Sequence, residues 1–119
     1  MSNITVKRIY ASSEPGDGTR VLVDRLWPRG ISKAKANIDL WLKDISPSDD
    51  LRKRFHAKPE SWDAFRSAYA EELQGEATQA AAAELRALLR KGPVTLLYAA
   101  KDERYNNAVA LKEWLDRHG

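Results

Sequence analysis

Two nearly continuous apolar runs, far apart in the sequence, constrain the fold of this chain most. They cover residues 21–23 and 94–98. A strand without polar alternation is typical of a sheet covered on both faces, as in α/β proteins with parallel strands. The long stretch between the runs has room for the crossover helices that parallel strands require. The sequence therefore predicts that strands 20–24 and 94–98 are adjacent and parallel.

The remaining strand and turn signals are shorter. Alternation and β-branched residues favour a first strand over 4–9, and proline and glycine favour a turn over 12–19. Residues 32–37 fit a loop or a single turn. Residues 38–45 fit either a half-buried strand or a helix, and we favour the strand.

Helix signals fill the middle and the end of the chain. Residues 46–50 combine capping serines, a proline and two acids, which is a helix-start signal. Apolar spacing and terminal glycines then predict helices over 51–56, 59–75, 76–91 and 105–117. Together with the strands, these helices indicate the α/β class: one domain over 1–119, with helices packed on a small, mainly parallel sheet.

Composition narrows the classes of protein that this chain can belong to. Its 119 residues suit one hydrophobic core, and no apolar run is long enough to span a membrane. The first residues contain no apolar signal core, so we expect a soluble cytoplasmic protein. Zero cysteines and two histidines leave no basis for a thiolate or transition-metal site, so we predict no metal and no cofactor.

Polar side chains follow both apolar runs. The carboxyl ends of parallel strands share one edge of an open α/β sheet, and ligands bind there. The amino end of helix 105–117 is expected at the same edge, where its free N–H groups and its dipole favour anions. The candidate ligand-binding residues at this edge are Asp24, Arg25, Trp27, Arg29, Lys101, Asp102, Asn106 and Asn107.

The basic stretch 52–58 adds Arg52 to the candidates. Arg52 and His56 are four residues apart and share a helix face. His56 has the chemistry of an acid or base near neutral pH, although a surface histidine without a role is the alternative. Ser46 and Ser48 lack the motif of a catalytic serine, and helix capping is sufficient to explain them.

An internal polar network is the alternative interpretation of the same residues. Asp24 would then pair with Arg25 or Arg29, and Asn106 would only cap the last helix. Trp27 would be an anchor in the core instead of the wall of a pocket.

Three spaced motifs resemble the YeaO-like branch of the bacterial domain of unknown function 488. They cover residues 20–30, residues 41–55 and residues 96–108. The resemblance implies a small cytoplasmic α/β protein and does not specify a reaction. The wider family often carries cysteines and a Cys-His-Arg triplet in the last motif, where this chain has Tyr98 and residues 106–108. Thiol chemistry is therefore not carried over.

Three functions remain open. The leading prediction is a pocket for a small molecule that bears phosphate or carboxylate, which arginines bind bidentately. The second is a nucleic-acid-associated or regulatory module, because residues 1–58 carry a net charge of +5 and residues 59–119 one of −2. No nucleic-acid-binding motif accompanies that charge. The third is a protein-interaction domain without a pocket, and whether the chain is an enzyme is left open.

Overall fold

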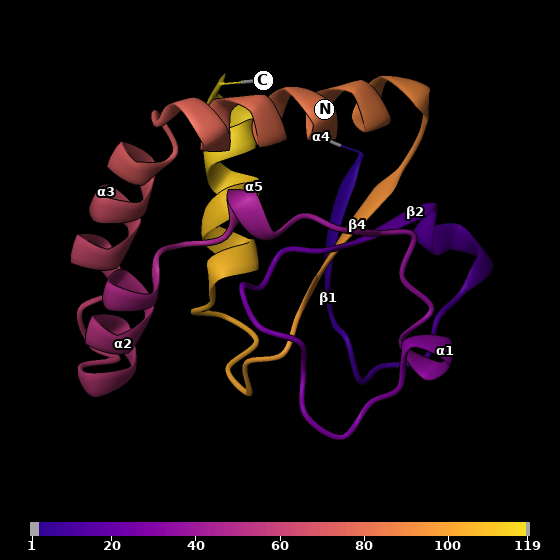
Figure 1. Ribbon diagram of the computed structural model, residues 1–119, viewed down its shortest axis with the longest axis horizontal. Helices are drawn as coiled ribbons and strands as arrows, with labels where there is room; N and C mark the ends of the chain where they lie inside the picture. The colour runs from indigo at the N-terminus through magenta and orange to yellow at the C-terminus, as the bar shows by residue number, and fades with distance from the viewer. Residues whose placement is uncertain (1–2, 119) are drawn as a thin grey trace.

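The computed structural model describes residues 3–118 and confirms a small α/β fold with an all-parallel, four-stranded sheet (Figure 1). Residues 1–2 and 119, which the predicted domain 1–119 includes, lie outside the described residues. The elements in chain order are β1 (Ile4–Arg8), the 3-10 helix η1 (Pro15–Asp17), β2 (Thr19–Leu22), α1 (Lys33–Ala36), β3 (Leu40–Trp41), the 3-10 helix η2 (Lys43–Ile45), α2 (Asp49–Ala57), α3 (Trp62–Glu72), α4 (Glu76–Lys91), β4 (Val94–Tyr98) and α5 (Asn107–His118).

The last strand of the chain, β4, lies in the middle of the sheet. The strand order is β1-β4-β2-β3, so β4 pairs with both β1 and β2. Leu96 is in register with Val6 on one side and with Val21 on the other. All five residues of β4 are buried, which explains their apolar character. The predicted parallel pairing of strands 20–24 and 94–98 is thus confirmed.

Residues 38–45, predicted as a strand with a helix as the alternative, form neither one continuous strand nor one helix. Its strand is limited to β3, although Leu42 N still donates to Leu22 O at 2.9 Å. The chain then tightens into η2, which buries Ile45 in the core. The residues that alternate in the sequence therefore split between two short elements.

The predicted helices are present with shifted ends. The helix expected from residue 59 begins at Trp62, because a turn in which Ser61 N donates to Lys58 O at 2.9 Å precedes it. Ser48 caps α2, where its side-chain oxygen accepts from Leu51 N at 3.2 Å. This confirms the capping interpretation of that serine.

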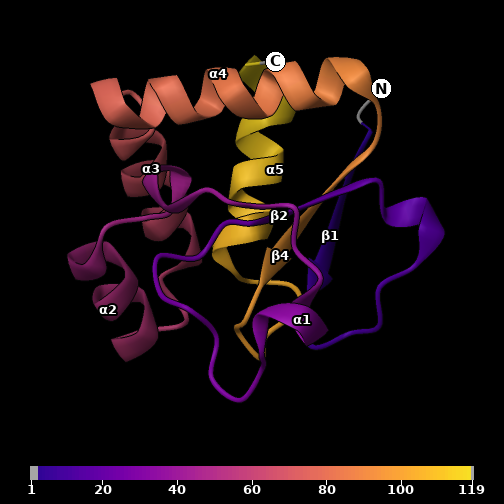
Figure 2. The same ribbon diagram turned by 45° about the vertical axis from the view of Figure 1, so that its right-hand side comes forward.

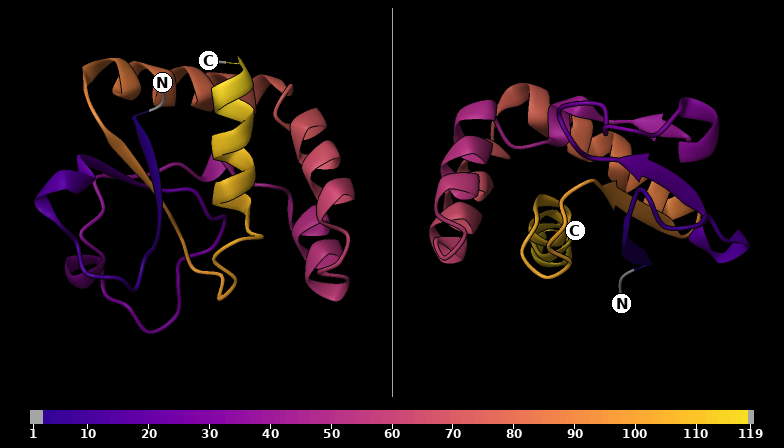
Figure 3. Two further views of the ribbon diagram at one scale, coloured as in Figure 1. Left: turned by 180° about the vertical axis from the view of Figure 1, so that it is seen from behind. Right: turned by 90° about the horizontal axis from the view of Figure 1, so that it is seen from below.

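The two faces of the sheet are covered differently. Figures 2 and 3 show the long helices α3, α4 and α5 gathered on one side, with α4 crossing the end of the molecule where the strands begin. The main core packs these helices against Val21, Leu96 and other strand residues. On the opposite face, Leu22 and Leu97 pack with α1 and the connecting segment that contains Trp27. This smaller core is therefore covered mainly by connecting segments without regular secondary structure.

A charged network supports the second face. The buried guanidinium of Arg20 pairs with the Asp17 carboxylate and donates to Ala36 O at 3.0 Å and Asn37 O at 2.8 Å. Lys7 Nζ pairs with the other Asp17 oxygen at 3.2 Å. Because every one of these donors meets an oxygen, the network fixes α1 to the sheet without leaving an unpaired charge.

Gly18 makes the close approach of β2 to the start of β4 feasible. It has φ +65°, and a Cβ at this position would lie 2.2 Å from Pro93 O. The next residue, Thr19, donates from its N–H to the same carbonyl at 3.0 Å. A side chain is therefore excluded here both by backbone conformation and by space.

We predict that Gly18→Ala lowers the free energy of unfolding by about 2 kcal/mol or more, from the strained φ and the clash together. Urea denaturation measures the loss. Gly16→Ala is the matched control, since a Cβ there meets nothing within 4 Å. Equal midpoints for the two variants would contradict the packing described at Gly18.

Candidate functional site

The carboxyl ends of the strands lie together at the end of the molecule opposite α4. In Figures 1 and 2 the connections that follow β1, β2 and β4 run close to one another there, near α1. The start of α5 lies beside the end of β2, because the Asn107 side chain donates to Val23 O at 3.0 Å. The edge predicted to carry the site is therefore formed by these connections and by α5.

Asp24 joins three of these segments. Its Oδ2 accepts from Ala99 N at 2.9 Å, and its Oδ1 accepts from the side-chain amide of Asn107 at 3.1 Å. Burial raises the pKa of the Asp24 carboxyl, whereas the two hydrogen bonds and the nearby positive charge of Arg52 act in the opposite direction. Asp24 thus occupies the donors that would otherwise face an external anion.

The prediction that Asp24 pairs with Arg25 or Arg29 is wrong. Arg25 turns away and donates from Nε to Pro47 O at 3.1 Å, and its Nη2 lies 3.5 Å from Ser46 O. The Arg29 side chain is exposed and forms no hydrogen bond or ion pair within residues 3–118. A main-chain N–H and an amide satisfy Asp24, because the parallel strands bring residue 99 and α5 to it.

Arg52 is the predicted cation that acts on Asp24. It is half-buried on α2 and pairs with Asp49 at 3.2 Å. Its Nε is buried and has no hydrogen-bond partner among the described residues. His56, four residues along, is exposed.

The other predicted residues have local contacts. Trp27 packs edge-on against Trp41, with ring centroids 5.4 Å apart, and donates from Nε1 to Ile31 O at 2.8 Å. Asn106 is buried and caps α5 through Val109 N, at 2.9 Å. Asp102 accepts from Tyr105 N at 3.0 Å and Arg104 N at 2.9 Å, and these bonds lower the pKa of its carboxyl.

Lys101 is exposed and unpaired within residues 3–118. Of the predicted residues, hydrogen bonds or charge bring together Asp24, Asn107 and Arg52. Within residues 3–118, no hydrogen bond or ion pair joins Arg25, Arg29 or Lys101 to that group. Contact of any of the predicted residues with a ligand stays a prediction.

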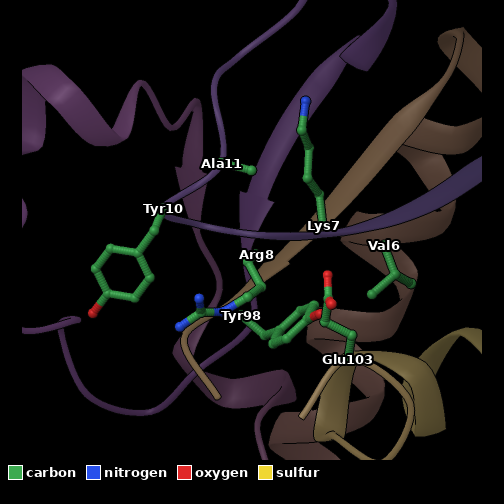
Figure 4. Close-up of a pocket in the computed structure, with 7 residues that line it drawn as sticks. All are labelled: Val6, Lys7, Arg8, Tyr10, Ala11, Tyr98 and Glu103. Atoms are coloured by element: carbon green, nitrogen blue, oxygen red, sulfur yellow. The ribbon is translucent and has the colours of Figure 1, made fainter. Parts of the chain in front are cut away.

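A cleft of about 470 Å³ lies at the same edge of the sheet, beside the ends of β1 and β4 (Figure 4). Its volume falls in the range of small-molecule sites. The lining residues are Val6, Lys7, Arg8, Tyr10, Ala11, Tyr98 and Glu103.

Arg8 is the cation that faces this cleft without a carboxylate partner. Its Nε donates to Ala100 O at 3.0 Å and its Nη2 to Ala99 O at 3.2 Å, which fixes the guanidinium beside the connection that follows β4. The guanidinium carbon also lies 5.0 Å from the centre of the Tyr10 ring. Within residues 3–118, no carboxylate lies within ion-pair distance of the Arg8 guanidinium.

The sequence prediction missed the cleft-lining residues because it considered only the two apolar runs. The first strand was predicted over 4–9, and Arg8 lies next to its end. The parallel pairing of β1 with β4 places Arg8 at the same edge. The strand-end argument that selected Asp24 and Lys101 would have selected Arg8 as well. Glu103 had no comparable signal, since its position depends on the path of residues 99–106.

The described residues offer no set of metal ligands. No group of three or more His, Asp or Glu side chains lies close enough to hold an ion within residues 3–118. In the same part of the chain, none of the helices has the length and apolar character needed to cross a membrane.

Comparisons with known proteins identify the family of this chain. The family model described as "Inactive DUF488-N3 subclade" matches residues 3–118. The chain belongs to the DUF488 family. It is 44% identical to the uncharacterized protein YeaO of Escherichia coli, over 95% of this chain and 96% of that protein. Uncharacterized proteins of Mycobacterium bovis and Mycobacterium tuberculosis are each 41% identical, over 97% of this chain and 95% of theirs. No solved structure matches the chain significantly.

The positions at which the resemblance to the wider family implies a cysteine and a Cys-His-Arg triplet lie at this edge. Tyr98, at the place of the first family cysteine, lines the cleft, and burial raises the pKa of its phenol. Asn106 caps α5, Asn107 holds Asp24, and Ala108 is fully buried. The residues at the place of the Cys-His-Arg triplet thus have structural contacts in this member of the family.

We predict that Asp24→Asn lowers the free energy of unfolding by about 1–3 kcal/mol at pH 7, because one amide oxygen cannot accept from both donors. Asp44→Asn, at an exposed position, is the control.

The raised pKa of Asp24 means that the folded state binds its proton more tightly than the unfolded chain. The stability of the wild type should therefore rise relative to Asp24→Asn as the pH falls from 7 toward 4. Urea denaturation across this range measures it, and the opposite slope would contradict the burial of the carboxyl.

Proposed function

We propose that this protein binds a small anionic molecule, bearing carboxylate or phosphate, at the C-terminal edge of its sheet, with Arg8 as the residue that recognises the anion. The observation that carries the proposal is a guanidinium held by two main-chain carbonyls at a cleft, with no carboxylate partner within residues 3–118. A fixed planar guanidinium loses little conformational entropy on binding and presents paired donors to an oxyanion.

The proposed role is binding without chemical conversion of the ligand. The matching family model describes its subclade as inactive. The resemblance to the wider family implies a thiol motif at positions where this chain has tyrosine and asparagines. The described cleft is lined by no histidine, serine or cysteine. These observations support retention of a site that recognises a ligand after loss of the groups that would react with it.

Two other predictions remain beside this one. The cluster of Asp24, Arg52 and Asn107 lies at the same edge, and we retain it as support for the connections that border the ligand. The basic half of the chain carries exposed lysines that are unpaired within residues 3–118, among them Lys33, Lys35 and Lys53. Nucleic-acid binding through these lysines is the alternative outcome of the experiment below.

The test is thermal unfolding with inorganic phosphate or propionate as the probe. We expect at least one probe to raise the Tm of the wild type, since a ligand at 100 times its Kd stabilises a protein by about 2.7 kcal/mol. Arg8→Met should abolish the rise. Arg8→Lys keeps the charge but not the paired donors, so we expect a reduced rise.

Arg90→Met is the matched control, because Arg90 is exposed on α4 at the other end of the molecule. It should leave the rise in Tm unchanged. Absence of any rise in the wild type, or an equal rise in Arg8→Met, would overturn the proposal. A rise with a single-stranded oligonucleotide alone would favour the nucleic-acid alternative.

A further inference from the structure

The cleft carries one unpaired charge of each sign. Glu103 lines it together with Arg8, and within residues 3–118 its carboxylate forms neither a hydrogen bond nor an ion pair. Both groups act on the Tyr98 phenol, whose pKa Glu103 raises and Arg8 lowers. Figure 4 shows the Tyr98 ring between the two charges. A purely anionic ligand would be attracted at one end of this ring and repelled at the other.

Lys7 does not change this balance. Its ammonium pairs with Glu14 at 2.9 Å and with Asp17 at 3.2 Å. In Figure 4 its side chain extends away from Arg8 and Glu103. The cleft is therefore dipolar, with a cation and an anion on either side of the Tyr98 ring.

The cleft also runs along the outer edge of β1 at Val6. In the sheet formed by residues 3–118, β1 is the first strand of the order and has β4 as its one neighbouring strand. Asn3 O accepts from Val94 N at 2.9 Å and Ile9 N donates to Tyr98 O at 2.8 Å, so the odd-numbered residues of this segment face β4. The N–H and C=O of Val6 consequently point outward, beside the cleft that its side chain helps to line.

We infer that the cleft takes a short zwitterionic peptide, with its carboxylate on Arg8, its ammonium on Glu103 and its main chain paired with the edge of β1 at Val6. The inference rests on the proposed function, because the peptide carboxylate is the anion of that proposal. A peptide main chain is the ligand that pairs with a free strand edge, and charged chain ends match the two ends of the cleft. Glu103 thereby becomes a specificity-determining residue.

Isothermal titration calorimetry with four matched probes tests the inference. The probes are L-alanyl-L-alanine, its N-acetyl form, its C-terminal amide and 5-aminopentanoate, which spaces the same charges without a peptide group. We expect the dipeptide to bind and each of the other three to bind about tenfold more weakly, as for the loss of one hydrogen bond to a charged group or of main-chain pairing.

Variants assign the two ends of the peptide. Glu103→Gln should reduce the preference for the dipeptide over its N-acetyl form from about tenfold to below about twofold. Glu84→Gln, at an exposed position on α4, should leave this preference unchanged. Arg8→Met should remove binding of both probes. Replacement of exposed Glu103 breaks no hydrogen bond or ion pair of its carboxylate within residues 3–118.

The results separate this inference from the proposed function. Equal binding of the dipeptide and its N-acetyl form would overturn the inference while the anion site stands. Equal binding of 5-aminopentanoate would overturn the peptide as the ligand class. Failure of the dipeptide alone would overturn the inference, whereas failure of the dipeptide, propionate and inorganic phosphate together would overturn the proposed function as well.

Discussion

The carboxylate of Asp24 is the interaction on which the C-terminal edge of the sheet depends. It accepts one hydrogen bond from the chain that leaves β4 and one from the first residue of α5, so one side chain ties three segments together. An anion inside the fold thereby uses the donors that parallel sheets ordinarily present to ligands. The open cleft is displaced to the β1 side, where Arg8 has no carboxylate partner within the described residues.

The layout of the sheet could be predicted because it follows from burial. Residues 94–98 are apolar because they lie in a central strand, and a central parallel strand needs crossover helices on the way to it. The element boundaries were less predictable. Residues 38–45 show alternation, yet β2 offers them only a short pairing edge before Ile45 is drawn into the core through a 3-10 helix.

The site was only partly predictable, for a different physical reason. Strand ends indicate which residues reach one edge, and Asp24 and Asn107 do meet there. The directions of the side chains depend on tertiary contacts, which the spacing of apolar residues in the sequence does not predict. Arg25 turns to the carbonyls of residues 46 and 47, while Arg8 turns to those of residues 99 and 100. The direction of each arginine side chain is thus set by main-chain carbonyls, and because every residue carries a carbonyl, the sequence does not show which one accepts.

The position of β4 in the sheet bears on how the chain folds. β1 and β2 do not pair with each other, and each pairs with β4, which is synthesised much later than either. On the ribosome, both early strands must therefore wait with unsatisfied edges until residues 94–98 emerge. Contacts of such long sequence separation slow folding and lengthen exposure to aggregation.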